Sequence, residues 1–352
     1  MKKFLALILA LCMIFALAAC GQQAASPAPA ATEAPAAAPA ANDSEPAPVD
    51  SAPAPAATGL TDADITKDLT IIVPSGAGGA TDIAVRAFVE FFKDHWPTNV
   101  NVINIGGAGG SAAYNELKNY DNDGYTITVA MASYPMNLAI GTFAGEYTWD
   151  TWEPICGLFS GYFSLCVRTD SPITTFEEFV NEVKTNPNFK YGLYSNSPAT
   201  GIRLVLEDYT GVSFNAIDVA EDAKATELLA GRVDAVADFF SQQNIYVKSG
   251  DFRCLGIFVG DRLAEFPDIP TMKEQGVDYD ITTQIMGLIA PQGTPQEMVD
   301  YICQKVQETY EQEEGLKPKY DELYYESLFM NSEDYTEFVQ GLIDNYDKFI
   351  NG

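Results

Sequence analysis

The stretch that decides the fold runs from Ile71 to Arg86 and reads IIVPSGAGGATDIAVR. Its β-branched residues 71–73 predict a short strand that Pro74 ends, and the glycines after it predict a turn. Thr81-Asp82 then begins an apolar pattern of helical period. Such a loop lets bare backbone approach a ligand, and the first amides of the following helix have no partner inside it. The stretch therefore predicts a site for an anion.

The same arrangement occurs a second time, a short distance along the chain. Val100 to Ile105 is another apolar run, followed by the glycine-rich residues 106–110 and by a helical stretch from Ser111 to Asn119. A single glycine-rich loop of this kind is also how a dinucleotide-binding domain or an ordinary strand-to-helix connection begins. Its repetition favours a ligand site that is built from two loops.

The N-terminal segment has the features of a lipoprotein signal. Lys2 and Lys3 precede an apolar run that ends at Leu17-Ala18-Ala19-Cys20. The run is shorter than the roughly 20 apolar residues of a transmembrane helix. It resembles the lipobox of bacterial lipoproteins, in which the cysteine becomes the lipidated first residue. We expect residues 1–20 to be a signal peptide and Cys20 to carry the lipid, with a plain cleaved signal as the alternative.

Residues 21–60 are dominated by alanine and proline and show no apolar periodicity. They have too little bulky apolar surface to offset the entropy lost on ordering. We expect a disordered tether that spaces the folded part from the membrane. The remaining residues, from about Thr61 to Gly352, are enough for two α/β lobes with a core each.

The chain is strongly acidic. It has 49 Asp plus Glu against 20 Lys plus Arg, a formal net charge of -29, and loss of Lys2 and Lys3 with the leader brings the charge to -31. This charge repels phosphate backbones, so nucleic acid is excluded as a partner. It also keeps the body off anionic lipid, so only the lipid anchor should touch the membrane. An anionic ligand would have to be held by local dipoles against this field.

Side chains for hydrolytic or metal chemistry are scarce. The single histidine, His95, falls near the end of the first predicted helix, where a helix C-terminal role suits it better than that of ligand or base. It leaves no Ser-His-Asp arrangement, HExxH zinc site or Cys-His pair. Outside the leader and the lipid site the cysteines are Cys156, Cys166, Cys254 and Cys303. They show no CxxC spacing, which argues against a metal site and thioredoxin-like chemistry.

Cys156 and Cys166 lie in two apolar runs, 154–159 and 162–167, around Ser160-Gly161. If these runs form a hairpin, the two cysteines face each other across it, and a disulfide is one option outside the cytoplasm. Buried free thiols are the state that we favour.

Strands and helices alternate through the rest of the chain. The further predicted strands are 125–131, 190–193, 214–219, 233–238, 253–258 and 281–291. The predicted helices are 174–185, 199–209, 221–230, 241–247, 295–311, 316–325 and 332–350. Helix 174–185 carries a capping signal, Thr174 or Thr175 followed by Glu177-Glu178. Repeated alternation predicts a mostly parallel sheet with ligands at the carboxyl ends of its strands.

Taken in order, these segments resemble one family: the extracytoplasmic solute-binding proteins of tripartite tricarboxylate transporters, also called Bug receptors. The segments that carry the resemblance are PSGAGGATDIAVR (74–86), NIGGAGG (104–110), DGYTITV (123–129), LLAGRVDAVAD (228–238), FPDIPTMKEQG (266–276) and GLIAPQGTP (287–295). The resemblance implies a two-lobe α/β fold of the periplasmic-binding-protein type II class, with mostly parallel sheets and a ligand cleft between the lobes. Lobe 1 would be 61–168 plus 285–352 and lobe 2 would be 169–284, with the chain crossing near Arg168 and Gln284.

The activity that the resemblance implies is capture without catalysis and without a cofactor. Two lobes close on a small carboxylate-bearing solute and present it to multi-span membrane permease subunits. We expect a lipid-anchored monomer outside the cytoplasm. A chemosensory lipoprotein that signals to a partner is the alternative. An enzyme that uses a dinucleotide is disfavoured, because Val102-Ile103-Asn104 stands where an acid is usual about 20 residues beyond the loop.

The candidate site follows from the loops and the strand ends. In this family loop amides and waters hold a ligand carboxylate. The candidate ligand-binding residues are Ser75, Ala77, Gly78, Gly79, Ala80, Thr81, Asp82, Asn104, Gly109, Ser133, Ser195, Asn196, Ala199, Asp218 and Asp238. For several of them a purely structural role is the alternative: Thr81 and Asp82 could cap the first helix, and Asn104 could stabilise a turn. Ser133 could end the third strand, Asp238 could cap the helix that follows it, and Asp218 could be a solvated loop acid.

Two departures from the family pattern bear on the ligand. Many relatives have Glu-Asn-Arg-Pro before the second glycine run, whereas this chain has residues 103–106, Ile-Asn-Ile-Gly, and so lacks a fixed positive charge. Relatives commonly show Pro-Tyr-Lys-Gly in lobe 2, whereas this chain has residues 217–220, which include Asp218. A second ligand carboxylate that faced Asp218 would be repelled. We therefore expect an amino acid or hydroxy acid ahead of a tricarboxylate.

Overall fold

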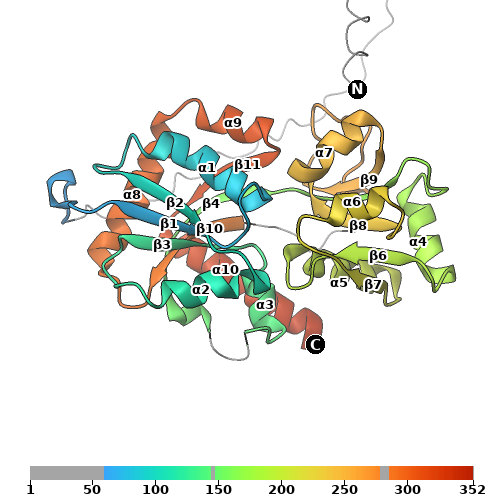
Figure 1. Cartoon of the computed structure of the whole chain (residues 1–352), viewed down its shortest axis with the longest axis horizontal. Coiled ribbons are helices and arrows are strands. Elements are labelled where there is room, and N and C mark those ends of the chain that lie inside the picture. Colours follow the sequence, from blue (N-terminus) through green and yellow to red (C-terminus); the bar gives the residue numbers. More distant parts are fainter. Residues whose placement is uncertain (1–58, 144–146, 278–284, 352) are drawn as a thin grey trace, which may run out of the picture. The chain divides into compact units, whose positions relative to one another are not determined.

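The structure, a computed structural model, describes residues 59–143, 147–277 and 285–351, all within one compact unit. These residues form two β-sheets that are covered by helices (Figure 1), which confirms the predicted α/β class. The predicted signal peptide with Cys20, nearly all of the predicted tether and the predicted crossing near Gln284 lie outside the described residues.

The first sheet has the strand order β11-β4-β10-β3-β1-β2. Its strands are β1 (Leu69–Val73), β2 (Val100–Asn104), β3 (Thr126–Ala130), β4 (Trp152–Gly161), β10 (Ile285–Pro291) and β11 (Tyr325–Met330). Strand β1 runs parallel to β2 and β3, with Ile71 opposite Val102 and Ile127. Strand β10 runs antiparallel to β3 and β4, and β11 runs antiparallel to β4.

The second sheet has the order β7-β6-β8-β5-β9. Its strands are β5 (Phe163–Arg168), β6 (Lys190–Leu193), β7 (Asn215–Asp218), β8 (Ala235–Phe239) and β9 (Phe252–Phe258). Strand β6 is parallel to β7 and β8, whereas β5 is antiparallel to β8 and β9. Both sheets are thus mixed and not mostly parallel as predicted. In the second sheet the reason is that β5 follows β4 without a helix between them. Strand β5 therefore does not obey the strand-helix-strand rule and runs antiparallel to its neighbours β8 and β9.

Helices cover both faces of the first sheet (Figure 1). The helices are α1 (Ala80–Phe92), α8 (Gln296–Gln312) and α9 (Leu316–Glu322) on one face, and α2 (Ser111–Leu117), α3 (Tyr134–Ala139) and α10 (Ser332–Asn351) on the other. Successive strand residues point to opposite faces. Ile71 accordingly packs in the core cluster that holds Phe88 of α1, whereas Ile72 packs in the cluster that holds Tyr114 of α2 and Tyr335 of α10.

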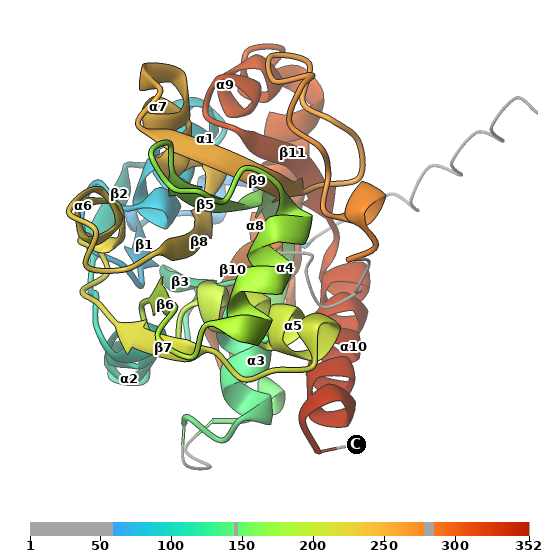
Figure 2. The same ribbon diagram turned by 90° about the vertical axis from the view of Figure 1, so that its right-hand side faces the viewer.

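The second sheet carries α4 (Phe176–Thr185), α5 (Pro198–Thr210), α6 (Lys224–Leu229) and α7 (Phe240–Ser249). Helices α4 and α5 lie side by side (Figure 2). The predicted cap of α4 is confirmed: Thr175 accepts a hydrogen bond from Glu178 N, and the Glu178 side chain returns to the backbone of Thr175. None of the helices in the described ranges is long and apolar enough to span a membrane.

The chain passes from the first sheet to the second at Tyr162. Strand β4 ends at Gly161, and β5 begins at Phe163 and pairs only within the second sheet. The sheet boundary therefore lies ahead of the predicted crossing near Arg168. A Cβ atom at Gly161 would clash with the ring of Phe239, so the two sheets approach closely here because this residue has no side chain.

The hairpin that would have placed Cys156 opposite Cys166 does not form, because β4 and β5 belong to different sheets. Cys156 lies opposite Leu288 in β10, whereas Cys166 lies opposite Val236 in β8 and Cys254 in β9. Cys156 and Cys166 are both buried free thiols.

Candidate functional site

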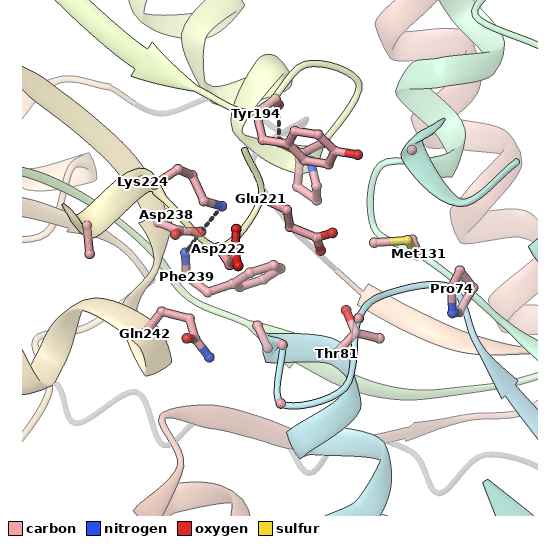
Figure 3. A pocket seen from close by; sticks show the side chains of 18 of the residues that line it. Pro74, Thr81, Met131, Tyr194, Glu221, Asp222, Lys224, Asp238, Phe239 and Gln242 are labelled. Carbon is pink, nitrogen blue, oxygen red and sulfur yellow. Dashed lines mark hydrogen bonds and ion pairs between the residues drawn. The ribbon is translucent and has the colours of Figure 1, made fainter. Parts of the chain in front are cut away.

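A cavity of about 460 Å³ opens where the carboxyl ends of the parallel strands of both sheets meet. This volume lies in the range typical of small-molecule sites. The first sheet contributes the loops after β1 and β2 and the end of β3, and the second sheet contributes the loops after β6 and β7 and the start of α7 (Figure 3). Placement at strand ends agrees with the position predicted from the sequence.

The loop after β1 presents backbone to the cavity. Gly78 has φ +79°, a left-handed conformation that glycine adopts without strain, and a Cβ atom there would meet open space. Helix α1 begins at Ala80, and its N-cap residue, Gly79, has no side chain to accept a hydrogen bond from the first turn. The amides at the start of α1 are therefore available to a negatively charged group in the cavity.

Asp82 stabilises this loop through hydrogen bonds on the side away from the cavity. Its carboxylate accepts hydrogen bonds from Gly78 N at 2.8 Å, from Arg86 Nε at 2.8 Å and from Asn104 Nδ2 at 2.9 Å. Asn104 also donates to the Ser75 carbonyl at 3.1 Å and accepts from Arg86 Nη2 at 2.9 Å. One buried network thus joins the loop after β1 to the end of β2.

The side chain of Asp82 is almost fully buried, at 3% exposure of the residue. Burial raises its pKa, but the hydrogen bonds from Arg86, Gly78 and Asn104 outweigh burial and hold the pKa below the ordinary value. Asp82 and Asn104 do not line the cavity. Asp82 is also not the N-cap of α1, because that residue is Gly79.

The second glycine loop lies against the first glycine loop and against the loop after β6. A Cβ atom at Gly106 would come within 3.1 Å of Gly76 N, so the two glycine loops are in close contact. A Cβ atom at Gly109 would come within 2.8 Å of the carbonyl oxygen of Asn196, which lies in the loop after β6. Asn137 Nδ2 donates to the same oxygen at 2.9 Å. The loops of the two sheets therefore touch at this edge of the cavity.

The second sheet contributes charged side chains. Lys224 Nζ lies 2.6 Å from Asp238 Oδ1, and each side chain is only 10% exposed. Asp238 Oδ1 also accepts from Phe239 N at 2.9 Å. Glu221 and Asp222 extend into the cavity from the loop before α6 (Figure 3).

Glu221 is exposed at the mouth of the cavity, where the surrounding walls desolvate it only in part. This partial desolvation raises its pKa, and the negative charges of Asp238 and Asp222 raise the pKa further against the opposing effect of Lys224. Burial also raises the pKa of Tyr194, and the charges of Glu221 and Asp218 add to that effect. A carboxylate and a phenol therefore lie close together on the wall that the second sheet forms.

The structure brings many of the predicted residues together and leaves others outside. The predicted residues that line the cavity are Ala77, Gly78, Gly79, Ala80, Thr81, Gly109, Asn196 and Asp238. The predicted residues that do not line it are Ser75, Asp82, Asn104, Ser133, Ser195, Ala199 and Asp218. Ser75, Ser133 and Ala199 are buried, so their side chains pack behind the loops.

Asp218 is the prediction with the largest consequence, and it does not line the cavity. Its Oδ1 accepts a hydrogen bond from Ser195 N at 2.8 Å, so it ties the end of β7 to the loop after β6. The acids that reach the cavity are Glu221 and Asp222, in the next part of the same loop. The predicted helix 221–230 has Glu221 and Asp222 in its first turn, so neither acid was among the predicted site residues. In the structure α6 begins only at Lys224, so both acids belong to the loop.

Sequence reasoning also missed part of the lining. Met131 and Tyr194 directly follow strands, so the rule that ligands bind at strand ends could have identified them. Some other lining residues have no such signal, because they do not follow the end of a parallel strand: examples are Phe163, Gln242, Ile245 and Tyr246.

Comparison with known proteins places the chain among solute receptors. A sequence model described as "Tripartite tricarboxylate transporter family receptor" matches residues 86–352. The chain is 31% identical over 290 residues to the "UPF0065 protein in gbd 5'region" of Cupriavidus necator, covering 78% of this chain and 83% of that protein.

Two solved structures show the same fold. The periplasmic binding protein BugD matches with a TM-score of 0.73 and 23% identity, over 81% of this chain and 96% of that chain. MatC (Rpa3494) from Rhodopseudomonas palustris with bound malate matches with a TM-score of 0.71 and 21% identity, over 80% and 98%. These likenesses confirm the predicted periplasmic-binding-protein fold.

The Asp82 network makes a prediction about stability. We expect Asp82→Asn to lower the free energy of unfolding at pH 7 by about 1–3 kcal/mol, because asparagine offers one acceptor oxygen to three donors. The folded pKa of Asp82 is below its unfolded value of about 3.9, so the ionised carboxylate stabilises the fold above that value. The difference between variant and wild type should shrink as pH falls through the folded pKa of Asp82.

Urea denaturation at a series of pH values measures this difference. Asp268→Asn, which removes an exposed acid far along the chain from the network, is the matched control and should leave stability nearly unchanged. Equal stability of Asp82→Asn and wild type at pH 7 would contradict the stabilising role.

Proposed function

Since the chain belongs to the tripartite tricarboxylate transporter receptor family, we propose that its cavity captures a small carboxylate-bearing solute outside the cytoplasm. The solute is then delivered to multi-span permease subunits in the membrane. Members of a receptor family act by binding, so the site is a binding site and not a catalytic one. The chain acts as a monomer with no cofactor.

One observation carries this proposal: the start of α1 faces the cavity with bare backbone. Gly78, Gly79, Ala80 and Thr81 all line the cavity, and α1 has no side-chain cap at Gly79. Gly78 N is bonded to Asp82 and Gly79 N to the Gly76 carbonyl, so the donors left for a ligand are the first amides of α1. A carboxylate seated there receives hydrogen bonds from these amides and the favourable end of the helix dipole. MatC, which shares the fold, is a protein with bound malate, and malate carries carboxylates.

Closure of the cavity rests on contacts between loops of the two sheets. Asn137 and Gly109 meet the carbonyl of Asn196 at one edge. Elsewhere, the phenol of Tyr325 donates to the Ala80 carbonyl at 2.8 Å and accepts from Ser241 Oγ at 2.9 Å, which joins α1 to α7. A ligand that binds between the loops favours the arrangement in which these contacts are made, and its release requires the Asn196 edge to open.

The far end of the ligand is neutral or cationic, as in an amino acid or a hydroxy acid, ahead of a tricarboxylate. The cavity lining supports this choice because Lys224 is already paired with Asp238, while Glu221 and Asp222 add negative charge. A second or third ligand carboxylate on this side would be repelled.

The ligand class is tested by native mass spectrometry of protein that is purified without refolding. We expect a retained organic acid, and addition of that acid to ligand-free protein should raise Tm by mass action. A retained nucleotide, or stabilisation by nucleotides and by no organic acid, would overturn the receptor proposal.

The loop amides are tested by a pair of glycine substitutions. Gly78 and Gly211 both have positive φ and open space around the missing Cβ, but only Gly78 lines the cavity. Alanine at either position should cost about 1–2 kcal/mol of stability. Only Gly78→Ala should also weaken binding of the retained acid, measured by calorimetric titration. Equal affinities in the two variants would remove this loop from the site.

The lipid anchor is tested by Cys20→Ser expressed in the native host. Without the thiol no thioether to lipid can form, so the protein should move from the membrane fraction to the soluble fraction. The control is wild type under the same fractionation. An unchanged membrane fraction would contradict lipidation at Cys20.

A further inference from the structure

The two walls of the cavity differ in electrostatic character. The wall from the first sheet consists of glycine-loop backbone, the start of α1, Pro74 and Met131, with Thr81 as its polar side chain (Figure 3). The wall from the second sheet carries Glu221, Asp222 and Asp238. A ligand that spans the cavity therefore meets amide donors at one end and carboxylates at the other.

Lys224 does not balance this excess of negative charge. It is the one cationic side chain among the described residues that line the cavity, and it is paired with Asp238 at 2.6 Å. Both side chains of that pair are mostly buried, so the charge of Lys224 is matched before any ligand arrives. Glu221 and Asp222 remain as two uncompensated acids.

Glu221 is placed to act on a ligand. In Figure 3 its side chain extends from the loop before α6 toward the space between Met131 and Thr81, which belong to the opposite wall. Within the described part of the chain, neither Glu221 nor Asp222 has a hydrogen-bonded or ion-paired partner. A cationic or donor group on the ligand would supply the partner that the protein does not.

We propose that Glu221, supported by Asp222, selects solutes that carry an ammonium group together with a single carboxylate. The inference rests on the proposed function and narrows it: an ammonium group forms a hydrogen bond with ionised Glu221 in which donor and acceptor carry opposite charges, whereas a hydroxyl is a neutral donor and adds no ion pair. A second carboxylate in the same place would be repelled or would require Glu221 to be protonated. Glu221 is thus the specificity residue, whereas the amides at the start of α1 bind the carboxylate that all the candidate solutes have in common.

The environment of Glu221 gives a second, pH-dependent signature. The groups around it are Lys224, Asp222, Asp238 and Tyr194. Partial desolvation in the cavity and the two acids raise the pKa of Glu221, against the opposing effect of Lys224. Affinity for an ammonium-bearing ligand should fall as pH drops through this raised pKa, because protonated Glu221 no longer attracts a cation. Affinity for a ligand without an amine should not show this fall.

Calorimetric titration with matched probes tests the proposal. The probes are linear acids of several chain lengths that end in an amino, a hydroxyl or a second carboxylate group, with α-amino acids and their α-hydroxy counterparts. For wild type we expect the best amino probe to bind about tenfold or more tighter than its hydroxy counterpart, and both to bind tighter than the dicarboxylate.

In Glu221→Gln that preference should largely disappear, while affinity for the hydroxy probe changes about twofold or less. Asp222→Asn should show the same trend with a smaller change. Glu177→Gln is the matched control, since it removes the same charge from the first turn of α4, outside the cavity, and should keep the wild-type preference.

The outcomes separate the two proposals. Carboxylate binding with no preference for the amine, or a preference that survives in Glu221→Gln, would overturn the selection by Glu221 and leave carboxylate capture standing. Failure of every acid in the series to bind would overturn carboxylate capture itself, and the selection would fall with it.

Discussion

A buried carboxylate at the start of α1 is the constraint on which the site depends. Two glycine loops have almost no side chains with which to hold their own shape, and their backbone must stay exposed to accept a ligand. Asp82 accepts hydrogen bonds from Gly78, Arg86 and Asn104 on the side away from the cavity. It therefore holds the shape of the first loop and leaves the backbone on the cavity side uncovered. It thereby fixes a loop whose open face is bare backbone. The residue thus acts on the ligand only through the positions of the amides.

Charge acts at two length scales in this protein. The chain carries a formal net charge of -29, which at long range repels the carboxylate that the site is proposed to bind. Amide dipoles at the start of α1 act over a few ångströms, inside a cavity from which solvent ions are partly excluded, whereas the field of the exposed acids is screened over about 10 Å in ordinary salt. Local donors can therefore hold an anion on an acidic protein, and the acids on the opposite wall then act on the rest of the molecule.

Residues that lie between the sheets fix the position of one cavity wall relative to the other. Gly161 lets β4 approach Phe239, and the phenol of Tyr325 touches both α1 and α7. Tyr325 belongs to β11, an edge strand that pairs with β4, the strand after which the chain leaves the first sheet. The start of α1 is thus linked through Tyr325 to α7, the helix that forms part of the opposite wall. A ligand that binds at the start of α1 would therefore have a direct route to the relative position of the sheets.

The sequence by itself determined the features that local patterns encode. Strand, glycine loop and helix at 71–86, the capping box at Thr175 and the cavity at strand ends all follow from side-chain period, capping chemistry and backbone freedom, which act within a few residues. Tertiary structure decided what depends on distant partners: β5 joins the second sheet, residues 325–330 form a strand beside β4 where a helix had been predicted to end, and Asp82 turns away from the cavity. It also decided which acid faces the cavity. Asp218 is bonded to the amide of Ser195, a contact across the chain that no local pattern contains, whereas Glu221 lines the cavity.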